Sequence, residues 1–318
     1  MLKIIENPVM NDKSIILYIG GWGRSGSTIL GHILGQMEQF FFVGELPEIW
    51  KIGVLENRYC ACGKRFRECE LWQEVFQRAF GGIDVIDAER MVRYRESGTR
   101  NRHIPQILFS KSRKRLFIQM DYYLHNLKKL YIAIHEVTNC KVIVDSSKWP
   151  AYGRMLAEIP EINMYLIHLI RDARAVVYSW QRQQELQPFT DEPMPRSPLG
   201  HLDSTKQWVV GNLATELFWN KDPSYKRLTY EDFVSNPNKS LEQILCMLNI
   251  CNWTTPVDEH NFVNLQSNHA LWGNPTRFQK GNTKIQIDNE WSSKMDKKNK
   301  FIVTLLTAPL LYKYGYLP

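Results

Sequence analysis

The stretch GWGRSGST, residues 21–28, decides the fold because it follows the apolar run IILYI at residues 15–19. An apolar run that leads into a glycine-rich loop is typical of a buried strand before a phosphate-binding turn. Gly21 and Gly26 have the separation of the nucleotide-binding consensus GxxxxGK[ST], and Thr28 stands where a hydroxyl would hold magnesium. Ser27 replaces the lysine of that consensus. The loop therefore lacks the cation that kinases use on the β- and γ-phosphates.

The same loop is suited to an anion smaller than a triphosphate. Its glycines let the backbone approach a ligand closely, and a helix that begins near Ser27 directs its positive end toward the loop. An unliganded glycine-rich turn is the alternative, but strand, loop and helix follow one another in the order that anion binding requires. We expect an anion to be bound by successive residues of the loop, namely Gly23, Arg24, Ser25, Gly26, Ser27 and Thr28.

Further apolar runs predict the other strands of a parallel sheet. They lie at residues 40–43, 141–144, 164–170 and 227–229. Helical patterns separate them, which predicts an α/β fold with a P-loop-like parallel sheet flanked by helices, in a single domain over residues 1–318. We expect a mainly helical insertion at about residues 51–115. The proline-rich stretch at about residues 187–200 is either a plain surface loop or a lid.

A second motif, LIHLIRDARAVVYSW at residues 166–180, follows the fourth predicted strand. Together with RSGST at residues 24–28, it resembles sulfotransferases that use 3′-phosphoadenosine 5′-phosphosulfate (PAPS) as co-substrate. The resemblance implies the sulfotransferase fold, a 5′-phosphosulfate loop, and a 3′-phosphate site at Arg171 and Ser179. Eight residues at about 100° each place these two on helix sides only about 80° apart, so the longer arginine can fold toward the serine.

Two further segments extend the resemblance over most of the chain. RLTYEDF, residues 227–233, is similar to the segment with the family's tyrosine near the adenine ring, which implies that role for Tyr230. NPTRFQKGNTKI, residues 274–285, is similar to the segment that folds over the 3′-phosphate in this family. It implies that Arg277, Lys280 and Gly281 bind the co-substrate.

The catalytic base has two main candidates. Glu45, in FFVGELPEIW at residues 41–50, follows the second predicted strand and falls at the same sheet edge as the phosphate loop. Bacterial and carbohydrate sulfotransferases commonly use a glutamate there, so the resemblance makes Glu45 the first choice. The alternatives for this region are that Glu45 caps the next helix, or that Glu48 is the working carboxylate.

Lys148, in KVIVDSSKWP at residues 141–150, is the second candidate. It matches a lysine of cytosolic sulfotransferases, but their catalytic histidine is absent from this segment. Lys148 is therefore expected to stabilise the transferring sulfuryl group. The less favoured alternative is that Lys148 is deprotonated and acts as the base. Asp145 is expected to orient it. Arg24 is expected to offset charge on the leaving group. His32 and His269 remain further alternatives for the base.

The cysteines argue against a metal site. Three of the six cluster in CACGKRFREC, as Cys60, Cys62 and Cys69. Structural zinc normally takes four ligands in C-x2-4-C pairs, whereas this first pair has one intervening residue and no clear fourth ligand follows. The sequence favours a tight loop with free or occasionally oxidised thiols, and no metal ligand is predicted.

Charge and composition narrow the partners. A net charge of +7 favours acidic ligands, but no zinc-finger spacing or basic repeat with interleaved aromatic residues predicts nucleic-acid binding. No apolar run approaches the ~18 residues of a membrane span, so we expect a cytoplasmic protein without membrane contact. The resemblance then implies sulfuryl transfer from PAPS, without metal, to a hydroxyl or amine of a small molecule. A P-loop small-molecule kinase is the alternative, and the sequence predicts no oligomeric state.

Overall fold

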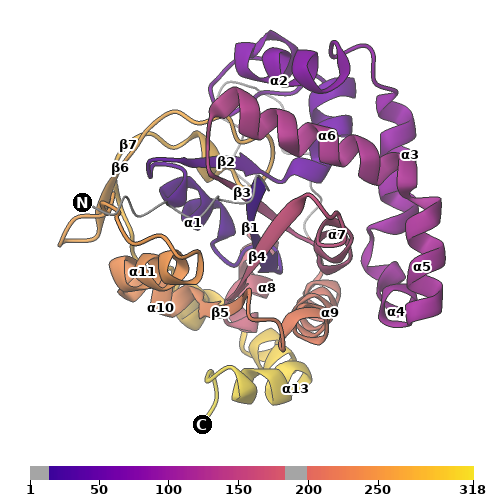
Figure 1. Ribbon diagram of the computed structural model, residues 1–318. Coiled ribbons are helices and arrows are strands. Elements are labelled where there is room, and N and C mark those ends of the chain that lie inside the picture. Colours follow the sequence, from indigo (N-terminus) through magenta and orange to yellow (C-terminus); the bar gives the residue numbers. More distant parts are fainter. Residues whose placement is uncertain (1–13, 183–198) are drawn as a thin grey trace, which may run out of the picture.

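A five-stranded parallel sheet forms the centre of the computed structural model, which describes residues 14–182 and 199–318 (Figure 1). The strands are β1 (Ser14–Gly21), β2 (Phe40–Gly44), β3 (Val142–Lys148), β4 (Ile162–Ile170) and β5 (Tyr225–Thr229). Their order across the sheet is β2-β3-β1-β4-β5, and all neighbours are parallel. The predicted α/β class is confirmed. Residues 187–198 of the predicted proline-rich loop lie outside the described residues.

Helices cover both faces of the sheet, which explains why the strands read as continuous apolar runs. In β1, Ile16 and Tyr18 point to one face while Leu17 and Ile19 point to the other, and all four are fully buried. The first face is covered by α6 (Asp121–Thr138), α7 (Pro150–Leu156) and α9 (His201–Trp219). The second is covered by α1 (Ser27–Leu34), α10 (Tyr230–Ser235) and α11 (Pro237–Met247).

A third apolar cluster lies beyond the end of β4. It joins α8 (Ala173–Gln181) and α9 to the C-terminal helix α13 (Lys297–Lys313), and the short α12 (Trp291–Lys294) packs beside it. Two short strands, β6 (Phe262–Leu265) and β7 (Gly281–Lys284), form a separate antiparallel pair that the sequence patterns did not predict. Within residues 14–182 and 199–318, no helix has both the length and the apolar character that crossing a bilayer requires.

The segment between β2 and α6 is mostly helical and lies along one side of the sheet (Figure 1). It begins with the short helical turns Leu46–Glu48 and Ile49–Leu55 and the turn Phe66–Glu68. It continues through α2 (Glu70–Phe80), α3 (Ala88–Gly98), the turn Asn101–His103, α4 (Ile104–Leu108) and α5 (Ser110–Gln119). An aromatic core at Phe66, Trp72 and Phe76 stabilises it, with ring centroids 5.6 to 5.7 Å apart around Phe66.

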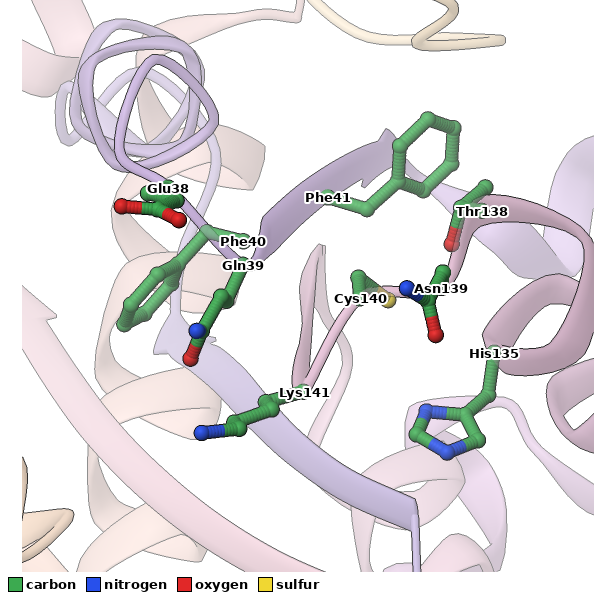
Figure 2. Close-up of a pocket in the computed structure, with 9 residues that line it drawn as sticks. All are labelled: Glu38, Gln39, Phe40, Phe41, His135, Thr138, Asn139, Cys140 and Lys141. Atoms are coloured by element: carbon green, nitrogen blue, oxygen red, sulfur yellow. The ribbon is translucent and has the colours of Figure 1, made fainter.

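A hollow of about 560 Å³ lies at the amino-terminal edge of the sheet, between the start of β2 and the turn from α6 into β3. Figure 2 shows Phe40 at the left of it, Phe41 above Thr138 at the upper right and His135 at the lower right. Parallel sheets of this type bind ligands at the opposite edge, where the strands end. We therefore expect the active site at the carboxyl ends of the strands and not in this hollow.

Candidate active site

Five of the predicted site elements lie at the ends of the five strands of the sheet. The phosphate loop follows β1, Glu45 follows β2, and Lys148 is the last residue of β3. Arg171 follows β4, and Tyr230 follows β5. Because the strands are parallel, their carboxyl ends lie at one edge of the sheet, and segments far apart in sequence meet there.

The phosphate loop has a conformation that its residue types explain. Gly26 has φ 88°, and a Cβ at this position would lie only 2.6 Å from the ring of Tyr230. Arg24 also adopts a left-handed conformation, with φ 68°, and the Ser25 hydroxyl donates to the carbonyl of Trp22 over 2.7 Å. Helix α1 begins at buried Ser27, so the unpaired N–H groups of its first turn carry the positive end of the helix dipole.

Trp180 of α8 closes one side of this loop. The Arg24 guanidinium lies over its ring, 4.9 Å from the centroid. Gly23 passes so close that a Cβ there would lie 2.9 Å from the Trp180 ring. The loop is thus held between the rings of Trp180 and Tyr230, which come from motifs far along the chain.

Arg171 connects the phosphate loop to the second motif. Its Nη1 donates to the carbonyl of Arg24 over 3.2 Å, across a sequence separation of 147 residues. The guanidinium also lies over the ring of Tyr230, 4.3 Å from the centroid. The structure therefore brings half-buried Arg24 together with buried Arg171 and Tyr230 at the sheet edge.

Asp288 occupies the remaining side of Arg171. Its carbonyl accepts from Arg171 Nη2 over 2.8 Å, and its carboxylate lies 3.2 Å from Arg171 and 2.7 Å from Arg182. Burial raises the pKa of Asp288, but the charges of Arg171 and Arg182 outweigh this effect and lower its pKa. A carboxylate between two guanidinium groups takes the place that a phosphate oxygen prefers.

The other residues implied for the 3′-phosphate come from α8 and from the segment that leads into β7. Ser179 is half-buried on α8, and no hydrogen bond joins it to Arg171 among the described residues. Arg277 is buried, donates to the carbonyl of Gly273 over 3.3 Å and lies over the ring of Phe278. Lys280 is exposed, and Gly281, with φ 84°, begins β7.

Glu45 and Lys148, the two candidates for the base, form one ion pair. Lys148 Nζ lies 2.8 Å from Glu45 Oε1 and 2.6 Å from the carbonyl of Ser146, and both charged side chains are less than 9% exposed. Lys148 has φ 68°, a conformation rare for a residue with a Cβ, which turns its side chain toward Glu45. A Cβ on Gly273 would lie 3.5 Å from Glu45 Oε1 and 3.3 Å from the hydroxyl of Thr28. Glu45 therefore lies close to the helix that carries the phosphate loop.

Asp145, predicted to orient Lys148, is bonded by residues of β3 and α6. Its carboxylate accepts from the Ser147 backbone N–H over 2.8 Å and from the hydroxyls of Ser147 and Tyr131. Burial raises the pKa of Asp145 to about 6, against an ordinary value of 3.8. Lys148 donates to Glu45 and Ser146 at the end of β3, where the register beside Gly20 of β1 is irregular.

Glu48, the alternative carboxylate, is engaged elsewhere. Its side chain lies 2.5 Å from the buried guanidinium of Arg95 in α3. This pair holds the first helical turn of the segment between β2 and α6 in place. Of the two carboxylates, Glu45 is the one close to the phosphate loop. The helix-cap alternative for Glu45 finds no side-chain hydrogen bond to the turn that follows it.

The histidine that the sequence suggested as an alternative base belongs to a separate cluster of side chains. His269 lies beside Cys60, Cys62 and Cys69, so the expectation that no fourth ligand follows the cysteines is wrong. No local spacing in the sequence indicates this fourth ligand, because 200 residues separate Cys69 from His269. Asp288 and Trp180 were missed for a similar reason, since only the folded chain brings them to the loop.

Comparison with known proteins gives one family. The model of the Sulfotransferase family matches residues 17–255. The sulfotransferase domain from the curacin biosynthetic pathway is similar at 18% identity, with 93% of this chain and 98% of that chain covered and a TM-score of 0.49. The sulfotransferase domain of the Synechococcus olefin synthase is 18% identical over 96% and 98% of the two chains, with a TM-score of 0.45. A sulfotransferase from Alicyclobacillus acidocaldarius is 12% identical over 95% and 94%, with a TM-score of 0.40. No curated protein matches the chain.

Proposed function

This chain belongs to the sulfotransferase family, and we propose that it transfers the sulfuryl group of PAPS to a hydroxyl or amine of a small-molecule acceptor. One observation carries the proposal: Arg171 donates a hydrogen bond of 3.2 Å to the backbone of Arg24. It supports a single nucleotide site that combines the phosphate loop with a second basic anchor. A loop without the consensus lysine is better matched to this donor than to a nucleoside triphosphate.

The donor would be bound from two sides. Backbone N–H groups at the start of α1, the hydroxyls of Ser25, Ser27 and Thr28, and the Arg24 guanidinium would hold the 5′-phosphosulfate. Arg171 would bind the 3′-phosphate after that group displaces the carboxylate of Asp288. Tyr230, whose ring contacts both Gly26 and Arg171, would form a wall for the adenosine. Ser179, Arg277, Lys280 and Gly281 are proposed to complete the phosphate site.

Glu45 is the proposed general base. The ammonium of Lys148 already donates to Glu45 and to the Ser146 carbonyl, so it acts as a cation and not as a proton acceptor. In the transfer, the acceptor oxygen or nitrogen forms a bond to sulfur in line with the breaking bond to the 5′-phosphate oxygen. The acceptor proton passes to Glu45. The electron pair of the broken bond stays on adenosine 3′,5′-bisphosphate (PAP), where loop amides and Arg24 offset its charge.

Transfer of labelled sulfate from PAPS to a panel of small hydroxyl and amine acceptors tests the proposal. We expect at least one acceptor class to be labelled in a buffer without added magnesium, and Glu45→Gln to serve as the inactive control. If no acceptor is labelled, a measurement of PAP binding distinguishes a panel that lacks the true acceptor from a wrong assignment of the donor. Failure to bind PAP, together with magnesium-dependent binding of ATP, would replace the proposal by a kinase.

A further inference from the structure

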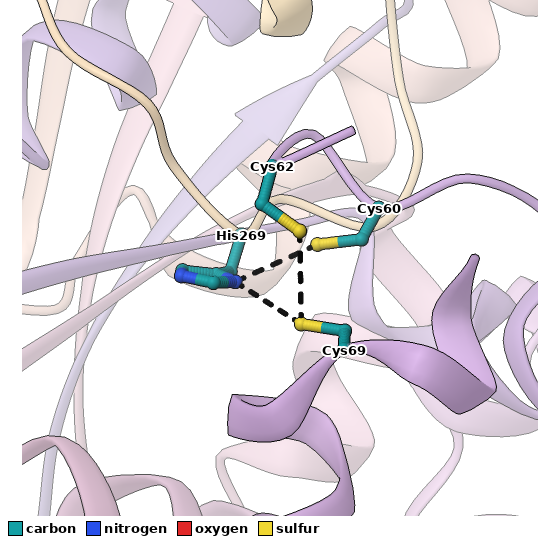
Figure 3. A group of neighbouring side chains, drawn as sticks. All are labelled: Cys60, Cys62, Cys69 and His269. Carbon is teal, nitrogen blue, oxygen red and sulfur yellow. Dashed lines mark hydrogen bonds between the residues drawn. The ribbon is translucent and has the colours of Figure 1, made fainter. Parts of the chain in front are cut away.

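Three cysteines and one histidine form a compact cluster at the base of the inserted segment (Figure 3). Their ligand atoms all lie within 4.8 Å of one another. Cys62 Sγ is 3.8 Å from Cys69 Sγ, while Nδ1 of His269 is 3.7 Å from Cys60 Sγ and 3.2 Å from Cys69 Sγ. None of the cysteines is in a disulfide. All four side chains point toward a common centre.

These separations match the edges of a tetrahedral zinc site. Bonds of about 2.3 Å from zinc to sulfur and about 2.0–2.1 Å to nitrogen place two sulfurs ~3.8 Å apart and a sulfur and a nitrogen ~3.6 Å apart. The sulfur pair agrees with the first value, and the two sulfur–nitrogen distances bracket the second. A disulfide would require a sulfur separation near ~2.05 Å and would leave the third thiol and the imidazole unused.

The backbone holds the four residues in place independently of their side chains. The Cys60 N–H donates to the Lys64 carbonyl and the Gly63 N–H donates to the Cys60 carbonyl, each over 3.0 Å, which closes a tight loop. Cys69 directly precedes α2. Two bonds attach the histidine segment: Ala61 N–H to the Ala270 carbonyl and Trp72 Nε1 to the His269 carbonyl, each over 3.1 Å.

Burial and ligand chemistry both favour a soft divalent metal. Cys60 and Cys69 are fully buried, and Cys62 and His269 are half-buried, so solvent has little access to the centre. Thiolate and imidazole are the ligands that zinc prefers, and a Cys₃His set is typical of a structural site. We propose that the chain binds one structural zinc ion through Cys60, Cys62, Cys69 and His269.

With four protein ligands the site is closed, so the zinc has no open position for a substrate and takes no part in sulfuryl transfer. Its role follows from the elements it joins. The histidine segment continues into Leu271, whose N–H donates to Val43 of β2 over 3.1 Å, and Trp272, whose carbonyl accepts from the N–H of Glu45 over 3.3 Å. The zinc therefore links the inserted segment to the strand that positions the proposed base.

Metal analysis of the full chain, produced without a histidine tag in zinc-supplemented medium, tests this inference. We expect about one zinc per chain by plasma mass spectrometry. Cys69→Ser and His269→Asn should each lower the zinc content at least about tenfold. The matched controls Cys246→Ser and His260→Asn change exposed residues and should leave it unchanged.

A measurement on the unaltered chain covers the case in which the variants fail to fold. Alkylation followed by peptide mass spectrometry should modify Cys246 and Cys251 but spare the three clustered cysteines until a strong chelator is added. The same treatment should lower Tm by at least about 5 °C, because a structural zinc contributes folding free energy. Zinc below about one tenth per chain, equal alkylation of clustered and exposed cysteines, or a Cys62–Cys69 disulfide would each overturn the inference.

Discussion

Among the ion pairs at the carboxyl edge of the sheet, Glu45–Lys148 and Arg171–Asp288 differ in how firmly they are held. Glu45 and Lys148 come from the ends of adjacent strands, and their side chains are 8% and 7% exposed. Arg171 is equally buried at 7%, but its partner Asp288 is 31% exposed and lies in the connection from β7 to α12. A pair fixed by two strands can set the charge of a reacting group, whereas a pair with one partner on a loop can exchange that partner for a ligand.

The largest expected effect comes from the fixed pair. Glu45→Gln should lower kcat by about 100-fold or more while leaving PAP affinity almost unchanged, because a general base acts only in the transition state. Steady-state kinetics together with calorimetric titration of PAP would check both halves. Glu48→Gln, a neighbouring carboxylate bonded to Arg95, is the matched control. Full turnover by Glu45→Gln would remove Glu45 from the role of base.

The two pairs also show what the sequence could predict. Glu45, Arg171 and Tyr230 each follow directly after an apolar run, so the strand pattern alone placed them at one edge. Asp288 and His269 lie in irregular connections without periodicity, and their partners are 117 and 200 residues away. No local spacing encodes such contacts. The apolar pattern also did not predict the irregular end of β3, where Lys148 donates to Glu45.

Substitutions in the second pair, Arg171 and Asp288, should change the affinity for the nucleotide more than kcat. Arg171→Ala should weaken PAPS binding by roughly 10- to 100-fold, the value of a charge-assisted contact to phosphate, with a smaller change in kcat. Arg171→Lys should recover only part of the loss, because lysine keeps the charge but not the planar fork. KM and kcat measured separately would show the split. Unchanged KM in Arg171→Ala would place the 3′-phosphate elsewhere.

A third carboxylate at this edge, Asp145, is fully buried and accepts hydrogen bonds from the hydroxyls of Ser147 and Tyr131. Burial raises its pKa to about 6 from 3.8, so the folded state favours the neutral acid. Its stabilising contribution is complete below about pH 4 and is lost as the pH rises through about 6. Each pKa unit corresponds to 1.36 kcal/mol, which sets a ceiling of about 3 kcal/mol and leaves about 1–2 kcal/mol after relaxation.

Denaturant unfolding at pH 4, 5, 6 and 7 would test the Asp145 prediction. The free energy of unfolding of Asp145→Asn should vary less across this window than that of the unaltered chain. Parallel pH profiles for the two proteins would show that Asp145 stays ionised in the fold.

The smallest expected effect is an increase in the affinity for PAP. Asp288→Asn removes the carboxylate that we propose competes with the 3′-phosphate for Arg171, so it should tighten PAP binding by about 3- to 10-fold. The fold should lose little stability, because Asp288 is 31% exposed and exposed ion pairs contribute little. The control is Glu290→Gln, which also loses an ion pair with Arg182 but, within the described part of the chain, has none with Arg171. Titration calorimetry at constant ionic strength measures both. Weaker PAP binding by Asp288→Asn would mean that Asp288 supports the site and does not compete for it.

The most direct measurement of the central claim is calorimetric titration of the unaltered chain with PAP, AMP and ATP, with and without magnesium. If the phosphate loop and Arg171 bind one nucleotide, PAP should bind at least about tenfold more tightly than AMP, which lacks the 3′-phosphate, and magnesium should make no difference. Equal affinity for PAP and AMP, or magnesium-dependent binding of ATP tighter than that of PAP, would contradict the account.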